Sequence, residues 1–229
     1  MAWNVNDILE FTKFLLRQNQ SGSISPDNFF YAWNSEQSVF IQDLIGRWQT
    51  RSSGKSGVNT GLIENETILT ILSPFTLTDS LTILSGNANK PSDFLYRLAM
   101  RINGYDCLKI DHNQLASVNQ SVIDPPSIAD NQFFFIEYED YYYFLPHTLP
   151  TATITTAELD YISQPIDIKW GFTWDAQNRK VYNSGTSVQP QWKQNEIVEI
   201  TKRTLSSFGI SYKDKDLQQF AAKTILTGD

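Results

Sequence analysis

The segment from Ser25 to Trp48 constrains the fold more than any other part of this chain, because it has the pattern of one long amphipathic helix. Ser25 suits the N-cap, Pro26 the first helical position, and Asp27 places negative charge at the positive end of the helix dipole. At about 1.5 Å per residue this helix is roughly 35 Å long. Its apolar stripe, which only Gln37 interrupts, needs covering partners and consists of Phe30, Trp33, Phe40, Leu44 and Trp48.

Helical patterns also occur toward both ends of the chain. From about Val5 to Gln18 an apolar stripe follows Asn4, the expected N-cap, with Asp7 in the capping-box position. Near the other end, the stripe from Asn195 to Phe208 stops at Gly209, which has the position of a C′ glycine. Two shorter helices are also predicted, over 64–72 and from residue 214.

The middle of the chain changes to short runs with the alternation and the β-branched or aromatic residues of strands. QFFFIEY and YYYFLP form a predicted hairpin about Glu139 and Asp140, and Pro125-Pro126 interrupts regular pairing before it. One helical turn is expected to begin at a cap, either Asp111 or Asn113, and to end at about Val118. The other predicted strands are 78–84, 94–102, 151–159, 166–174 and 180–183.

The order of these elements, α then β then α, predicts an α+β fold. The simplest closure packs the helices of both chain ends as an antiparallel bundle, formed by residues 1–75 and 192–229. Residues 76–191 then form an inserted antiparallel β-rich subdomain. The segment from Thr50 to Gly61 has three glycines and, except for Val58, no apolar residue, so we expect it to be a mobile loop.

Composition excludes several classes of protein. A hydrophobic fraction of 41% is that of an ordinary globular chain, while a net charge of −7 argues against a free-standing nucleic-acid binder. The single cysteine, Cys107, rules out a disulfide framework and fits a reducing compartment. Because no stretch reaches eighteen apolar residues and Met1 to Gln20 lacks the pattern of a signal peptide, we expect intracellular synthesis without a membrane anchor.

The residues that carry chemistry in enzymes are sparse here and lack the spacing that chemistry needs. His112 and His147 are in no metal-binding motif, and Cys107 has no sequence context that would activate its thiol. The GKS sequence at 54–56 lacks the earlier glycine and the preceding strand of a phosphate-binding loop. We therefore predict no enzyme activity, no cofactor and no metal. The acidic residues beside the hairpin turn, Glu137, Glu139 and Asp140, are interpreted as solvated charge rather than as paired catalytic acids.

Two groups of residues are candidates for an interface. Tyr141, Tyr142 and Tyr143 put rings on both faces of one strand, so something must cover the second face, either within the monomer or in a neighbouring subunit. Positive charge gathers at the end of the long helix and in the loop after it. The residues concerned are Arg47, Arg51 and Lys55. They are either part of a solvated loop or form a contact with an acidic neighbour or a DNA backbone.

Several segments together resemble one family. NDILEFTKFLLRQNQSGSISPDNFFYAWNSEQ resembles the opening of the head-to-tail connector proteins of crAss-like and related short-tailed bacteriophages, and ILSPF followed by KPSDFLY resembles their middle part. The closing series YISQPIDIKWGFT, VYNSGTSVQPQW and NEIVEITKRTLSSFGISYKDKDLQQFA is the most specific. The positions that match the family pattern are Tyr161, Pro165, Trp170, Trp192 and Gly209.

The resemblance implies a virion structural protein without catalytic residues. Such a protein forms a ring, dodecameric in this family, at the head–tail junction between the portal and the next tail or ring protein. Genomic DNA passes through the ring without sequence-specific binding. The chain would be made in the host cytoplasm and end in the virion. The five matching positions would be structural, with the tryptophans at the junction of bundle and sheet. The alternative that the residues leave open is a β-rich carbohydrate- or surface-binding module of the virion, with the tyrosines as a stacking platform.

Overall fold

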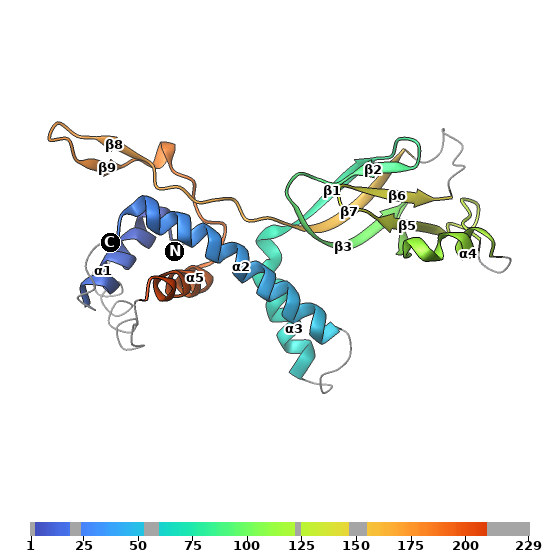
Figure 1. The fold of residues 1–229 in the computed structure, drawn as a ribbon, viewed down its shortest axis with the longest axis horizontal. Helices are drawn as coiled ribbons and strands as arrows, with labels where there is room; N and C mark the ends of the chain where they lie inside the picture. Colours follow the sequence, from blue (N-terminus) through green and yellow to red (C-terminus); the bar gives the residue numbers. More distant parts are fainter. Residues whose placement is uncertain (1–2, 19–23, 53–59, 122–124, 147–154, 210–229) are drawn as a thin grey trace. The chain divides into compact units, whose positions relative to one another are not determined.

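The computed structural model describes residues 3–18, 24–52, 60–121, 125–146 and 155–209 (Figure 1). The fold is α+β, as predicted. The chain divides into two compact units, which we call the helical unit and the β-rich unit. The helical unit comprises Met1–Pro74 and Pro165–Asp229, and the β-rich unit comprises Phe75–Gln164. Residues 165–191, which we expected in the β-rich insert, therefore belong to the helical unit instead.

The helical unit contains four α-helices and one hairpin within the described residues. Helices α1, α2 and α5 lie close to the predicted bounds. The loop predicted over 50–61 is wrong at both ends, because α2 extends to Ser52 and α3 begins at Thr60, and residues 53–59 lie outside the described part. The elements are α1 (Val5–Gln18), α2 (Pro26–Ser52), α3 (Thr60–Leu72), β8 (Phe172–Trp174), β9 (Lys180–Tyr182), a 3-10 turn (Ser184–Thr186) and α5 (Gln194–Ser207).

The expected caps form at the helix ends. At the start of α1, the Asp7 amide donates to Asn4 Oδ1 at 3.0 Å, and the Asn4 amide donates back to Asp7 Oδ2 at 2.8 Å, which is a capping box. Ser25 Oγ accepts from the Asn28 amide at 3.3 Å at the start of α2. Gly209 follows α5 with φ of +74°, a conformation that favours glycine and stops the helix.

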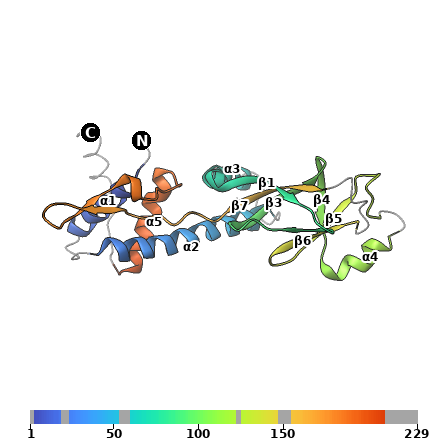
Figure 2. The same ribbon diagram turned by 90° about the horizontal axis from the view of Figure 1, so that it is seen from above.

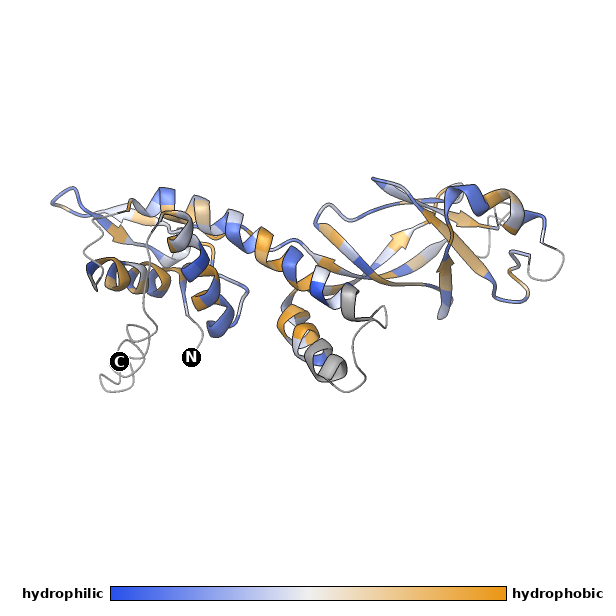
Figure 3. Ribbon diagram, turned by 60° about the horizontal axis from the view of Figure 1, so that its bottom comes forward, coloured by the Kyte–Doolittle hydropathy of each residue, from blue (hydrophilic) through white to orange (hydrophobic). Residues whose placement is uncertain are grey.

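The core of the helical unit lies along the apolar face of α2. Hydrophobic and hydrophilic residues alternate along this helix in Figure 3, and Phe30, Trp33 and Phe40 are buried. Helix α5 packs against α2 in both ribbon views (Figures 1 and 2). The Trp33 indole Nε1 donates to Thr201 Oγ1 of α5 at 3.2 Å. The antiparallel bundle of both chain ends is not shown, because residues 210–229, with the helix predicted from residue 214, lie outside the described residues.

The β-rich unit is one large, nearly closed sheet of seven strands in the order β1-β7-β3-β4-β5-β6-β2. All pairings are antiparallel except that of β4 with β5, which corrects the expected all-antiparallel insert. A 3-10 turn (His112–Gln114) and the short helix α4 (Leu115–Asn119) lie between β4 and β5 in the chain. The strands are β1 (Thr76–Thr82), β2 (Asn87–Asn89), β3 (Phe94–Ile102), β4 (Tyr105–Lys109), β5 (Phe133–Glu137), β6 (Tyr141–Leu145) and β7 (Thr156–Ser163).

Three predicted strands differ from the observed ones. The strand expected over 151–159 is β7, which extends to Ser163; residues 147–154 lie outside the described part. The strand expected over 166–174 is reduced to Phe172–Trp174. Strand β1 begins two residues before the predicted start, and all of its residues except Leu81 are exposed.

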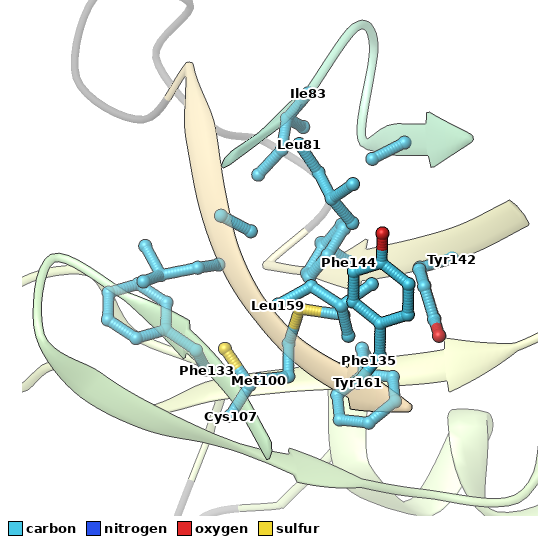
Figure 4. Packing of buried hydrophobic residues seen from close by; sticks show 13 residues of the cluster. Leu81, Ile83, Met100, Cys107, Phe133, Phe135, Tyr142, Phe144, Leu159 and Tyr161 are labelled. Atoms are coloured by element: carbon cyan, nitrogen blue, oxygen red, sulfur yellow. The ribbon is translucent and has the colours of Figure 1, made fainter. Parts of the chain in front are cut away.

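A single aromatic-rich cluster fills the interior of the sheet (Figure 4). The fully buried rings of Phe135, Tyr142 and Phe144 come from the predicted hairpin, and Met100 and Leu159 pack with them from β3 and β7. A smaller cluster of Ile110, Ile136 and Leu145 lies on the other side of β5 and β6, where Leu115 and Val118 of the helical turn pack against it. The hairpin therefore has apolar contacts on both of its faces.

Candidate interaction surfaces

The structure separates the three candidate tyrosines. Tyr142 points into the main core of the β-rich unit and is completely buried. Tyr143 is half-buried against the smaller cluster, and the ring of Tyr141 is stacked on Tyr138 with the centroids 4.7 Å apart. Contacts within the monomer thus cover much of the aromatic surface that the sequence displays, while Tyr141 and Tyr143 keep part of their surface exposed.

The basic candidates are only partly described. Arg47 lies exposed in the last turns of α2. Arg51 is within the same helix, but its side chain, like the whole of Lys55, lies outside the described residues. The structure therefore places one of these three side chains and brings no described partner to it.

The motif residue Tyr161 holds one end of β7. Its hydroxyl donates to Asp93 Oδ1 at 3.0 Å, and its ring is stacked on Phe94 with the centroids 6.0 Å apart. Burial, together with the hydrogen bond to Asp93, raises the pKa of Tyr161 to about 12. Strand β7 ends at Ser163, just before Pro165, where the chain passes into the helical unit.

The two motif tryptophans both belong to the helical unit. Trp192 is buried, donates from Nε1 to Gln37 Oε1 at 3.2 Å, and meets Phe40 edge to face. Trp170 donates from Nε1 to Asn6 Oδ1 at 3.3 Å and stacks on Phe172. Their role is to attach the segment that follows the β-rich unit to α1 and α2.

The candidate acids beside the hairpin turn have different surroundings. Glu139 and Asp140 are exposed at the turn, as expected for solvated charge. Glu137 instead has a side chain only 19% exposed, and it binds three cations of other strands and loops. Lys109 Nζ lies 2.9 Å from Glu137 Oε2, Lys90 Nζ 3.2 Å from Oε1, and Arg97 Nε 3.6 Å from Oε2.

Electrostatics favour the charged form of Glu137. Burial by itself works to raise the pKa of this carboxyl group, but the hydrogen bonds and charges of Lys109 and Lys90 outweigh it and lower the pKa below its ordinary value. Two of the cations also lie over aromatic rings, Lys90 4.7 Å from the Phe94 centroid and Arg97 4.7 Å from the Phe135 centroid. These ion pairs join three strands, because Arg97 lies in β3, Lys109 in β4 and Glu137 in β5.

The remaining cation of the β-rich unit, Arg101, is surrounded in the same way. Its guanidinium lies 2.7 Å from Asp160, 3.6 Å from Asp106 and 3.7 Å from Glu158. All four cations of this unit are therefore bound to carboxylates of the same unit. The residues from 75 to 164 include only these four lysines and arginines but eleven aspartates and glutamates, whereas the helical unit has fourteen of each. The whole net charge of −7 thus resides in the β-rich unit.

Sequence reasoning missed this separation of charge, although a count made separately for the two parts of the chain would have found it. It also missed the apolar surface of the β8–β9 hairpin. The centre of that hairpin is a stack of Trp170, Phe172 and Tyr182, and Trp174 and Val181 are 61% and 47% exposed.

Within the described residues there is no sign of a metal or reactive-thiol site. No group of three or more His, Cys, Asp or Glu side chains there could hold a metal ion. His112 is exposed beside the Tyr138 hydroxyl, and His147 lies outside the described part. Cys107 is buried, and burial together with the charge of Asp106 raises the pKa of its thiol to about 12.

The sequence matches no protein-family model and no curated protein. In the parts of the chain that the structure covers, no helix has the length and apolarity needed to cross a membrane.

Proposed function

We propose that this chain is a virion structural protein of a short-tailed phage, a subunit of a connector ring below the portal. The ring would join capsid to tail and continue the DNA channel, with the portal and the next tail or ring protein as its neighbours. Its role would be mechanical, without enzyme activity, cofactor or metal. The antiparallel bundle of both chain ends, completed by the segment after Gly209, belongs to the same proposal.

The observation that carries the proposal is the acidic character of the β-rich unit. All four of its cations are bound to its own carboxylates, so its remaining acids give its surface a negative field. A surface of this kind offers few counterion-releasing contacts to a phosphate backbone, and DNA can slide past it without sticking. The family resemblance of the opening, middle and closing segments supports the same assignment.

The test is electron microscopy of the purified protein, alone and mixed with the portal protein encoded in the same genome. We expect rings on the portal, with or without rings of the protein alone, since a portal can template assembly. A protein that stays monomeric and never joins the portal complex would refute the assignment.

The alternative function is a β-rich carbohydrate- or surface-binding module of the virion. Its stacking platform would be Tyr141, Tyr142 and Tyr143, but Tyr142 is buried and Tyr141 already stacks on Tyr138. We therefore favour the ring. Loss of glycan binding in Tyr141→Ala and Tyr143→Ala variants that still assemble would reverse this preference.

A further inference from the structure

Strand β1 has an open edge. It pairs with β7 on one side and is at the end of the sheet on the other. The Ile83 amide, just beyond β1, donates to the Thr155 carbonyl at 2.8 Å. Because backbone groups alternate in direction along an antiparallel strand, odd-numbered residues of β1 face β7, and the backbone groups of Thr78 and Ser80 face the open side. Among the described residues, the strand that pairs with β1 is β7, on the opposite side.

The chain itself supplies a substitute for the missing strand at this edge. The Ser80 amide donates to Oδ1 of Asp79 at 2.8 Å. The carboxylate oxygen therefore takes the position that a carbonyl oxygen of an added strand would have. Charged side chains at edge strands are a common protection against unwanted pairing, and this one can be displaced by a strand that brings its own positive charge.

An acidic cavity of about 430 Å³ adjoins the same edge. It is lined in part by Asp79, Glu158, Arg101 and the hydroxyl-bearing residues Thr78 and Ser80. The charged residues of its lining are the two carboxylates Asp79 and Glu158 and the single cation Arg101, which is paired with Glu158, so the cavity has a surplus of negative charge. A lysine or arginine side chain is the group that such a cavity accepts best.

The chain also contains a second open strand edge. The β8–β9 hairpin is a separate two-stranded sheet, so β9 has a paired strand on one side only within the described residues. Val181 in β9 is 47% exposed. The neighbouring Lys180 lies over the Phe172 ring and 3.4 Å from Asp27, whose side chain is 72% exposed. An ion pair this open is worth little, so Lys180 is free to exchange partners.

We propose that the edge of β1 in one copy accepts β9 of a second copy as an added strand, with Lys180 reaching Asp79 and the acidic cavity. The contact joins two different faces of the same chain, as ring assembly requires. This inference rests on the proposed ring function, but it concerns one contact and is tested separately.

The first test is crosslinking between copies. Thr78→Cys/Val181→Cys protein is treated with a short bismaleimide and run on a denaturing gel. We expect a ladder of linked oligomers, while each single variant gives no ladder. The matched control is Thr78→Cys/Thr173→Cys, since Thr173 is the partner of Val181 on the other strand of the hairpin; it should link far less. Linkage only within one chain, or equal ladders in both double variants, overturns the proposal.

The second test exchanges the charges. Asp79→Lys and Lys180→Asp should each weaken self-association in sedimentation by about tenfold, the scale of losing one close interfacial charge pair. The combined variant should restore it. Absence of restoration, with all three variants folded by circular dichroism, contradicts the pairing. If the wild-type protein forms rings on the portal but the Thr78→Cys/Val181→Cys protein gives no crosslink between copies, this contact is wrong and the ring function stands. If the crosslink forms but no ring joins the portal, the contact stands and the ring function fails.

Discussion

The Trp192 indole donates to Gln37 Oε1 at 3.2 Å, so the one polar residue in the apolar stripe of α2 is paired with a tryptophan far along the chain. The Gln37 side-chain amide also donates to the Ile166 carbonyl at 3.1 Å. Two segments that follow the β-rich unit are thus attached to the long helix by a single side chain. Gln37, the residue that interrupts the apolar stripe, therefore binds the segment after the β-rich unit to α2.

Gln37→Leu should lower the free energy of unfolding of the helical unit by about 1–3 kcal/mol, because the buried Trp192 N–H and Ile166 carbonyl lose their partner. Tryptophan fluorescence in urea measures this, since all six tryptophans lie in the helical unit. Gln42→Leu, at an exposed position of the same helix, is the control and should change stability little. Equal urea midpoints of unfolding for Gln37→Leu and the wild type would show that these two hydrogen bonds do not stabilise the helical unit.

Gly171→Ala and Gly46→Ala should have opposite effects. A Cβ at Gly171 would overlap Thr186, including its backbone, whereas a Cβ at Gly46 meets nothing within 4 Å. We expect Gly171→Ala to destabilise the helical unit by about 1–3 kcal/mol through overpacking, and Gly46→Ala to stabilise it by about 0.5–1 kcal/mol through helix propensity. Thermal unfolding followed by tryptophan fluorescence compares the two, and a neutral Gly171→Ala would contradict the close approach.

Tyr161→Phe and Tyr142→Phe remove the same atom from different surroundings. The Tyr161 hydroxyl donates to Asp93, so its loss should cost about 1 kcal/mol. The Tyr142 hydroxyl is buried without a hydrogen-bond partner in the described structure, so its removal should be neutral or stabilising. Urea unfolding followed by circular dichroism tests this order, and the reverse order would be inconsistent with the two environments.

Glu137→Gln should make the free energy of unfolding of the β-rich unit depend less on pH in the acid range. The pKa of Glu137 is lowered in the folded state, so its charge contributes stability above the unfolded pKa, and this is lost as pH falls through the folded pKa. The wild type should therefore exceed Glu137→Gln in stability at pH 7 and approach it in acid. Glu139→Gln, at the exposed turn, serves as the control. A difference independent of pH would mean that packing, not charge, accounts for the cluster.

Cys107 should be unreactive in the folded protein. Burial raises the pKa of its thiol to about 12, so almost no thiolate exists at pH 8. We expect a disulfide reagent such as DTNB to react only after the β-rich unit unfolds in urea. Reaction in native buffer at the rate of a small free thiol would exclude the buried position.

The sequence by itself determined the elements whose signals are local. Caps at Asn4 and Ser25, the stop at Gly209 and the spacing of apolar residues define α1, α2 and α5, because a helix is built from contacts between residues three or four apart. The hairpin of β5 and β6 was predictable for the same reason, since two strands and their turn are contiguous. The proposed function combines a family resemblance, which was visible in the sequence, with the acidic character of the β-rich unit, which depends on where the units begin and end.

Only the tertiary structure decided which distant segments meet. The parallel pairing of β4 with β5, the place of 165–191 in the helical unit and the gathering of three cations on Glu137 all join residues far apart in the chain. Local periodicity says which face of a strand is apolar but not which strand lies beside it, because partner choice depends on packing of the whole sheet. For the same reason Tyr142 could be assigned to the core, and β1 recognised as an open edge, only once every strand had its neighbours.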